Sequence, residues 1–479
     1  MNAMNPAFDT EAFKQAPHAL IGLTTTEKFS FGHDELEDIQ LAALQNRFAA
    51  MSETIPVLRR FAEDQNVHQI RSLADGALLL FPHTMYKSYP LSAIEHSRFE
   101  VMTRWVGTLT SIDLAGVQTA DCRTIDDWIE RLDTRTDIRL RHSSGTTGKL
   151  SFIPASAIEA YPAFLALRRF FEGFGDEPDA HISGLEDMPM VCFTHRRGAT
   201  ASSRLIDGVV QFLYGGDERK VFCINPGGLS ADMLSLGGRL ESAQAKGERG
   251  RLELSPELMA RREVFIQDQS EAPKRLDAFF ETLATDLRGR RVILYGVVPQ
   301  TAETAIEGLK RGYAGLFSPD SLFFQAGGAK GRALPDDYRD QVARFTGVPY
   351  PPTGYGMTEG AASLTRMCPH GRYHVQPNII AYVLDPDTGA LFPRRGTRTG
   401  RFGMIDLGAQ TRWGGFLSGD EVTLNFGDQS PCGCGRKGAF IEGEIRRYSE
   451  LRGGDDKITC AGTTGVHDKA LDFIAQMSE

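Results

Sequence analysis

The sequence predicts a mixed α/β protein built on a mainly parallel sheet. Short apolar runs at 188–195, 291–298 and 321–328 are typical of buried strands, because parallel strands are covered by helices on both faces. The last two runs are separated by 299–315, where apolar residues recur at helical spacing. A strand, a helix and a second strand in this order favour a βαβ unit, and ligands of such sheets gather at the carboxyl ends of the strands.

Antiparallel strands are expected after Cys368. The run at 379–393 has a turn signal at 387–389, and the run at 415–426 has another near 418–420. Each run is therefore predicted to form a hairpin.

Helices are predicted for residues 1–135, where the stretch 34–51 spaces its apolar residues three and four apart. From Asp137 the sequence alternates like a strand. Helical periodicity returns after the glycine-rich stretch that follows, with Ser156 as the expected N-cap. Because the 479 residues contain no linker and no internal repeat, we expect one large layered domain with a small appendage.

Composition argues against several classes of function. The net charge of −9 does not favour general affinity for nucleic acid, which draws on surplus Lys and Arg. No window approaches the ~18 apolar residues of a membrane span, and the N-terminus lacks the features of a signal peptide, so we expect a cytoplasmic protein without a membrane partner. The seven cysteines are an odd number, which favours thiols or metal ligands over a disulfide framework.

Residues 143–148 are small or hydroxylated, so their backbone N–H groups can close around phosphate oxygens while hydroxyls add further donors. The run is not a Walker loop, because Ser143 stands where that loop needs Gly and Leu150 follows Lys149. An ordinary hairpin turn is the alternative. The six positions are Ser143, Ser144, Gly145, Thr146, Thr147 and Gly148.

The order of the motifs resembles that of one enzyme family. The chain carries SSGTTG at 143–148, YGMTE at 355–359, SGD at 418–420 and GGDDKI at 453–458. In this order they resemble the motifs of the adenylate-forming superfamily, which includes acyl-CoA synthetases, the adenylation domains of peptide synthetases and firefly luciferase. With CGCGR at 432–436, the GGDDKI motif is most similar to the phenylacetate-CoA ligase and acyl-protein synthetase branch.

The resemblance implies that the chain activates a carboxylic acid with ATP as an acyl-AMP. A carboxylate attacks the α-phosphate and pyrophosphate leaves, so the phosphates, Mg²⁺ and the acid must be held in line. By resemblance, Glu359 is the Mg²⁺ ligand and Thr358 donates to the α-phosphate. A single carboxylate suits Mg²⁺, because this ion takes few protein carboxylates and shares its other positions with phosphates and water. The alternative for Glu359 is a carboxylate at a helix N-terminus.

The resemblance also implies how the nucleotide and the acid are bound. Asp420 would accept the ribose hydroxyls, and Tyr355 would stack on adenine, although a turn Asp and a core Tyr are the alternatives. The other predicted nucleotide contacts are Gly327, Gly328 and Gly356, which let the ligand approach the backbone. The predicted contacts to the acid are His195, Arg196, Gly328, Ala329 and Met357. For the basic pair, a solvated turn is the alternative.

Cys368, His374, Cys432 and Cys434 form a second constellation. Two thiolates separated by one residue, together with a Cys and a His from a predicted hairpin, suit a structural Zn²⁺. Members of the phenylacetate-CoA ligase branch carry zinc at a similar arrangement. Free thiols in turns are one alternative, and Cys368 as an acyl-accepting nucleophile, as in acyl-protein synthetases, is another.

The sequence departs from the family near its C-terminal end. The family's hinge resembles Asp455, and only residues 456–479 follow it. The resemblance therefore implies a helical N-terminal part at 1–135, an ATP- and acid-binding core at 136–452 and a strongly truncated C-terminal remnant at 453–479, without the mobile lid and its lysine. Candidates for the missing positive charge are Lys149, Lys330 and Lys457.

In length and general character the chain is similar to the atypical adenylating proteins of phenazine antibiotic biosynthesis. This resemblance implies a planar aromatic acid such as phenazine-1,6-dicarboxylate, and a pocket with flat apolar walls and a cation for the second carboxylate. The expected acceptor is CoA or a partner reductase, and a homodimer is compatible with the sequence. The rival functions are an acyl-protein synthetase that loads its own cysteine and a scaffold that captures an acid without turnover.

Overall fold

The computed structural model describes residues 10–143, 149–172, 179, 181–245, 259, 262–328, 333–352, 354–360, 365–429 and 431–448. Several sequence predictions fall outside these ranges, namely Ser144 to Gly148, Ala329, Lys330 and 453–479 with Asp455 and Lys457. Within the described ranges, no helix combines the length and the apolar character that crossing a bilayer requires.

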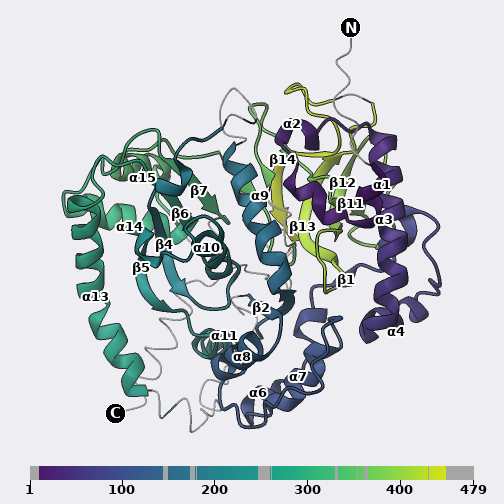
Figure 1. Ribbon diagram of the computed structural model, residues 1–479, viewed down its shortest axis with the longest axis horizontal. Coiled ribbons are helices and arrows are strands. Elements are labelled where there is room, and N and C mark those ends of the chain that lie inside the picture. The colour runs from purple at the N-terminus through teal and green to yellow at the C-terminus, as the bar shows by residue number, and fades with distance from the viewer. Residues whose placement is uncertain are drawn as a thin grey trace.

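A parallel sheet of four strands organises one half of the molecule, on the left in Figure 1. Its order is β5-β4-β6-β7, with β4 (Met190–Arg197), β5 (Val221–Gly228), β6 (Ile293–Val297) and β7 (Leu322–Ala326). Helix α14 (Val298–Lys310) connects β6 to β7, which confirms the predicted βαβ unit. The other helices of this part of the chain are α10 (Ala201–Phe212), α11 (Ala231–Ala245), α13 (Arg262–Thr285) and α15 (Tyr338–Thr346), with the 3-10 turns η4 (Leu185–Asp187) and η5 (Glu218–Lys220).

A mainly antiparallel sheet organises the other half. Its order is β10-β14-β13-β12-β11, with β10 (Tyr373–His374), β11 (Ile379–Leu384), β12 (Thr397–Asp406), β13 (Gly415–Asn425) and β14 (Phe440–Arg447). The short strand β1 (Phe81–Pro82) adds to β13 in parallel. The described residues therefore form a mixed α/β fold whose two larger sheets are one parallel and one mainly antiparallel, as the sequence predicts.

The turn predicted at 387–389 is confirmed. The Asp385 carboxylate accepts the backbone N–H groups of Asp387 and Thr388 at 3.0 and 2.8 Å, so the side chain closes the turn that follows β11. Gly389 has a φ of +71°, which favours glycine.

The turn predicted near 418–420 is wrong. Strand β13 runs through these residues without reversing, and it pairs with β12 on one side and β14 on the other. Ser418 is buried and donates its hydroxyl to the Phe402 carbonyl of β12 at 2.8 Å. The Ser-Gly-Asp sequence is thus a strand interior, because pairing on both edges overrides the local turn signal.

The strand predicted from Asp137 is confirmed as β2 (Ile138–His142), which pairs with β3 (Phe152–Ser156) as an antiparallel hairpin. Ser156 ends β3 and makes no capping hydrogen bond through its side chain. A 3-10 turn, η3 (Ala157–Glu159), follows, and helix α9 (Ala160–Glu172) begins only after it. A further short pair joins β8 (Gly354–Tyr355) to β9 (Thr365–Arg366).

Helices dominate residues 10–135. They are α1 (Thr10–Gln15), α2 (Thr25–Lys28), α3 (His33–Thr54), α4 (Pro56–Asp64), α5 (Leu73–Ala77), α6 (Leu91–Glu95), α7 (Phe99–Gly107) and α8 (Ile125–Arg135), with the 3-10 turns η1 (Pro17–Gly22) and η2 (Met85–Lys87). Helices α1, α3 and α4 lie beside the antiparallel sheet, and α6 to α8 lie at the bottom of the view in Figure 1.

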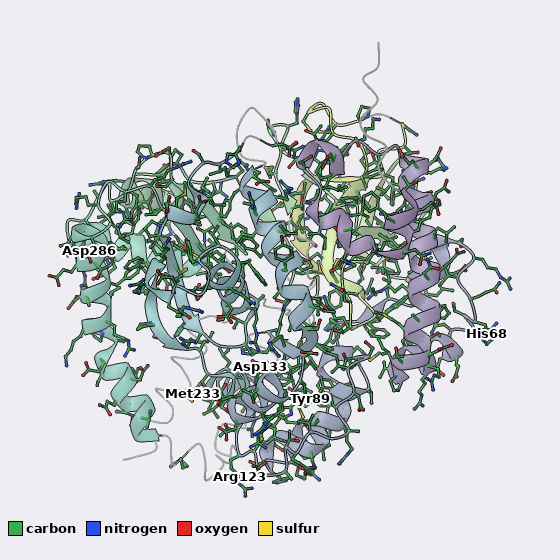
Figure 2. All side chains as sticks on the ribbon, in the orientation of Figure 1. His68, Tyr89, Arg123, Asp133, Met233 and Asp286 are labelled. Atoms are coloured by element: carbon green, nitrogen blue, oxygen red, sulfur yellow. The ribbon has the colours of Figure 1, made fainter. Side chains whose placement is uncertain are left out.

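Helix α9 lies between the two sheets (Figure 1). Below it, the buried Tyr89 lies among the N-terminal helices (Figure 2) and donates its hydroxyl to the Leu150 carbonyl at 3.0 Å. This bond ties the segment before β3 to the helical part. Helix α9 itself contacts helix α10 and the 3-10 turns η1 and η3.

Candidate active site

A cavity of about 370 Å³ lies between α9, α10 and the carboxyl ends of β6 and β7. The alanines of α9 form one wall, and a stacked aromatic pair forms another: the rings of Tyr295 and Phe324 have centroids 5.4 Å apart and planes at 18°. Ligands of parallel sheets bind at this edge, and a volume of this size is typical of small-molecule sites.

Four residues predicted from the motifs line this cavity, namely Gly327, Gly356, Met357 and Thr358. Gly327 directly follows β7 with a φ of +68°, which glycine adopts without strain. A Cβ on the neighbouring Gly328 would meet no atom within 4 Å, so this position is open rather than tightly packed. The main chain after β7 can therefore be approached closely by a ligand.

Glu359 is buried beside this wall, and its carbonyl accepts a hydrogen bond from Arg412 Nη2 at 3.0 Å. Burial raises the pKa of the Glu359 carboxyl and the charge of Asp420 raises it further, while Lys87 and Arg447 act in the opposite direction. A divalent cation would offset both the burial of this carboxylate and its repulsion by Asp420. The donor set therefore fits Mg²⁺.

Tyr355 and Arg447 both contact the Asp420 carboxylate. Tyr355 donates its hydroxyl to Oδ2 at 2.8 Å, and Arg447 Nε lies 3.6 Å from Oδ1. The Tyr355 ring packs 6.0 Å from Phe402 and 6.3 Å from Tyr373, so it belongs to the wall of a small apolar cavity of about 20 Å³ beside the main one. Tyr355 and Asp420, predicted separately, thus form one polar contact.

A fully buried ion pair supports the Glu359 segment. Arg412 Nη1 lies 2.6 Å from Glu159 Oε2, and neither side chain is exposed. Burial alone would raise the pKa of Glu159, but Arg412 and Arg141 outweigh burial and hold that pKa below its ordinary value. Because Arg412 also binds the Glu359 carbonyl, the ion pair connects η3 to the segment that carries the predicted Mg²⁺ ligand.

Three arginines line the main cavity, and the sequence interpretation missed them. Arg139 and Arg141 lie on β2, and Arg204 lies on α10, where it binds Asp133 at 2.6 Å. Burial lowers the pKa of Arg141 to about 10, which leaves it charged at neutral pH. The alternation of the strand could have identified Arg139 and Arg141, because residues two apart lie on the same face. Leu140 between them faces the core, so the two arginines face the other side.

The basic turn predicted to bind the acid lies elsewhere. His195 and Arg196 are buried in β4, and neither is among the residues that line the main cavity. The Arg196 guanidinium lies 2.7 Å from Asp207 and 2.7 Å from Glu218, so two carboxylates balance its charge.

The described ends of the predicted phosphate loop form a hairpin. Ser143 exchanges two bonds with Ser151: its N–H donates to the Ser151 carbonyl at 3.1 Å, and its hydroxyl accepts the Ser151 N–H at 3.0 Å. The Lys149 ammonium donates to the carbonyls of Tyr89 and Lys87 at 2.7 and 3.3 Å. Lys149 is therefore bound to the end of η2 and the residues after it, and it is not among the residues that line the main cavity.

The four predicted zinc ligands come together. The donor atoms of Cys368, His374, Cys432 and Cys434 all lie within 4.8 Å of one another. The Sγ atoms of Cys368 and Cys432 are 3.9 Å apart, close to the ~3.8 Å edge of a tetrahedron of ~2.3 Å Zn–S bonds and too long for a disulfide. Cys434 Sγ lies 3.2 Å from His374 Nε2.

The surroundings of this Cys₃His cluster suit a metal ligand set. Burial lowers the pKa of His374 to about 3, so the imidazole is neutral and offers a lone pair. The N–H of Gly371 donates to the Cys368 carbonyl at 2.9 Å and that of Gly435 to the Cys432 carbonyl at 2.8 Å, so two tight turns present the thiols. The cluster therefore fits Zn²⁺.

Comparison with known proteins gives weak similarities. No protein-family model and no curated protein matches the chain. Among solved structures, ATP-bound MatB from Rhodopseudomonas palustris is 13% identical over 73% of this chain and 57% of its own, with a TM-score of 0.33. The luciferase-like enzyme of the nonluminescent Zophobas morio mealworm is 13% identical over 64% of this chain and 56% of its own, with a TM-score of 0.32.

A long-chain-fatty-acid-CoA ligase from Archaeoglobus fulgidus is 11% identical over 65% of this chain and 52% of its own, with a TM-score of 0.26. The chain thus spans between 52% and 57% of the length of these three proteins. At such low similarity, an assignment of function depends on the residues of this chain alone.

Proposed function

We propose that this chain activates a carboxylic acid with ATP, forming an acyl-AMP and releasing pyrophosphate. The observation that supports this most is the meeting of Gly327, the 356–359 segment and a cavity lined by arginines at the carboxyl end of the parallel sheet. The cavity offers apolar walls and positive charge for an organic acid. The adjacent glycines and hydroxyl offer a place for phosphates.

In this reaction a carboxylate oxygen of the acid bonds to the α-phosphorus of ATP, and the bond from that phosphorus to the oxygen bridging to the β-phosphate breaks. Thr358, which is buried at the cavity wall, would donate its hydroxyl to the α-phosphate. Glu359 is the residue that would hold Mg²⁺, and neutralisation of phosphate charge is the chemistry this ion supplies when bound.

The ribose would bind near Asp420. The Tyr355 hydroxyl and Arg447 orient the Asp420 carboxylate, which would accept the sugar hydroxyls. In this arrangement the Tyr355 hydroxyl would orient Asp420, while the Tyr355 ring would contact the adenine.

The acid that suits the main cavity best is a planar aromatic dicarboxylic acid of the phenazine-1,6-dicarboxylate type. The small side chains of Ala160 and Ala163 and the stacked rings of Tyr295 and Phe324 make flat walls. Arg139 would bind the carboxylate that does not react, in place of His195 and Arg196.

The test compares two acids and two variants. Acid-dependent exchange of labelled pyrophosphate into ATP is measured with phenazine-1,6-dicarboxylate and with phenazine-1-carboxylate. Arg139→Gln should raise the KM for the dicarboxylate about tenfold or more, because it removes a charged hydrogen-bond donor, and change the KM for the monocarboxylate less. Arg219→Gln, at an arginine whose side chain is 90% exposed, is the matched control and should change neither.

Three outcomes separate the candidate functions. Exchange that depends on an aromatic acid supports the proposal, whereas acid binding without exchange would favour a scaffold that captures the acid. A hydroxylamine-sensitive acyl group on Cys368 would favour the acyl-protein synthetase. We regard the last outcome as disfavoured, because Cys368 is 5% exposed and faces Cys432.

We also propose that the Cys₃His cluster binds a structural Zn²⁺. Cys368 lies in the turn between β9 and β10, His374 lies on β10, and the other two ligands lie in the turn before β14, so the metal would hold these segments together. Metal analysis of gently purified protein tests this, and an absence of zinc at the expected one ion per chain would exclude it.

A further inference from the structure

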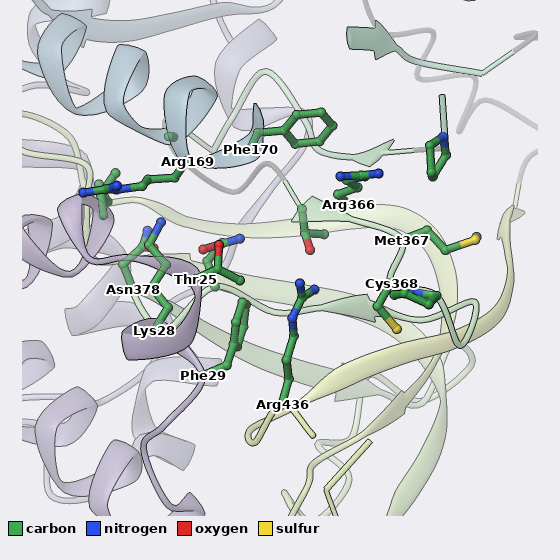
Figure 3. Close-up of a pocket in the computed structure, with 16 residues that line it drawn as sticks. Thr25, Lys28, Phe29, Arg169, Phe170, Arg366, Met367, Cys368, Asn378 and Arg436 are labelled. Atoms are coloured by element: carbon green, nitrogen blue, oxygen red, sulfur yellow. The ribbon is translucent and has the colours of Figure 1, made fainter. Parts of the chain in front are cut away.

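A second cavity, of about 140 Å³, lies between α2, the C-terminal half of α9 and strand β9 (Figure 3). Four cationic side chains line it, from segments far apart in the sequence: Lys28, Arg169, Arg366 and Arg436. Neither Asp nor Glu occurs among the described residues of its lining. Arg169 is paired with Glu172, which lies outside the lining, so the buried charge that needs an explanation is that of Lys28, since buried charges are normally paired.

Lys28 is only 5% exposed, and a cation buried to this degree normally has a partner of opposite charge. The two carboxylates whose charges it feels most are already bound to other groups. Glu172 accepts hydrogen bonds from Arg168 and Arg169, and Asp179 accepts the first backbone N–H groups of α2. The Lys28 ammonium thus lies at the cavity without a carboxylate of its own among the described residues.

The cations also disfavour one another. Burial lowers the pKa of Lys28 to about 8, and the charge of Arg169 contributes to the lowering. Holding these groups charged and close together costs folding free energy, and a bound anion would offset that cost.

The other lining groups define the size and chemistry of the ligand. Thr25, Gln376 and Asn378 add polar atoms, whereas Phe29 and Phe170 close two sides with apolar surface. A cavity of ~150 Å³ in another protein holds one benzene molecule, so the present volume suits a compact ligand. Guanidinium groups bind tetrahedral oxyanions through paired N–H donors.

We propose that this cavity is a binding site for a compact phosphate anion, either inorganic phosphate or pyrophosphate. The site is distinct from the main cavity, although Ala166 of α9 lines both. The pyrophosphate source rests on the proposed function, because that reaction releases pyrophosphate. The phosphate source does not depend on it.

The experiment titrates the full chain, without ATP or acid, with inorganic phosphate and separately with pyrophosphate by calorimetry at constant ionic strength. Lys28→Met keeps the buried stem and removes the charge, so it should weaken phosphate binding about tenfold or more. Lys28→Arg should bind nearly as well as the parent chain. Lys274→Met, which makes the same change at a side chain that is 75% exposed on α13, is the matched control and should leave binding unchanged.

Tighter binding of pyrophosphate than of phosphate, lost in Lys28→Met, would identify the product anion as the occupant, and equal or weaker binding would identify inorganic phosphate. Pyrophosphate that bound only at the nucleotide site would be insensitive to Lys28→Met. The proposal is overturned if neither anion binds, or if Lys28→Met and Lys274→Met bind equally while both remain folded by circular dichroism. Since no exchange is measured, failure of the proposed reaction would not be mistaken for failure of this site.

Discussion

Glu159→Gln is expected to destabilise the protein by about 3 kcal/mol at neutral pH, the lower end of the range for breaking a buried ion pair. Both Glu159 and Arg412 have no exposed side-chain surface, so the variant leaves the Arg412 charge buried and only partly balanced by Asp406 at 4.0 Å. The lower end is chosen because a Gln oxygen can still accept the bonds from the Gln410 N–H and the Thr411 hydroxyl.

The measurement is urea unfolding of the parent chain and the variant, followed by tryptophan fluorescence and circular dichroism. Asp217→Asn is the control, because it breaks an ion pair with Arg219, whose side chain is 90% exposed, and should have no measurable effect. Arg412→Met combined with Glu159→Gln should recover part of the loss, because the Arg412 charge is then no longer buried beside a neutral side chain.

The same pair predicts a pH dependence. Because Arg412 and Arg141 hold the pKa of Glu159 below its ordinary value in the folded state, its stabilising contribution is complete above the unfolded value of ~4.3 and is lost as pH falls through the lower folded value. The Gln variant should lack this component of acid destabilisation. Equal urea midpoints at pH 7, or equal acid sensitivity of parent and variant, would refute the assignment of a strong buried pair.

Two further predictions concern the predicted metal ligands. Glu359→Gln should weaken ATP binding about tenfold or more in the presence of Mg²⁺ but not in its absence, as measured by calorimetry. Glu444→Gln, on the exposed face of β14, is the control and should not weaken it, and an equal Mg²⁺ dependence in parent and variant would exclude Glu359 as the ligand. Cys432→Ser with Cys434→Ser should abolish zinc retention and lower the unfolding midpoint, because a structural zinc site contributes folding free energy directly, whereas Cys223→Ser should retain the metal; a double variant with unchanged zinc content would remove the site.

The parallel sheet was predictable because its strands are buried on both faces and therefore appear as continuous apolar runs. Val191, Phe193 and Leu294 are almost completely buried, and helices cover them. Strand β13 was not, because Ser418 to Asp420 is a turn signal when read locally. Only pairing to β12 and β14, the strands before and after it in the chain, makes it a strand interior, and a local turn signal does not contain that pairing.

In the candidate site, too, some residues could be predicted from the sequence and others could not. Glu359 and Asp420 were identified from short motifs, since both lie within continuous stretches of the sequence. The partners that give these residues their environment, Arg412 and Arg447, carry no local signal. Glu159 and Arg412 lie 253 residues apart, and no periodicity or spacing connects positions so distant.

Arg412 therefore affects both the position of the Glu359 segment and the stability of the fold. One guanidinium binds the Glu159 side chain of η3, directly before α9, and the Glu359 main-chain carbonyl next to the main cavity. The Arg412–Glu159 pair fixes this arrangement out of reach of water, because neither side chain has any exposed surface. The low local dielectric also strengthens the attraction between the two charges. Helix α9, whose alanines form a wall of the main cavity, begins directly after Glu159, so this wall and the predicted Mg²⁺ ligand share one buried support.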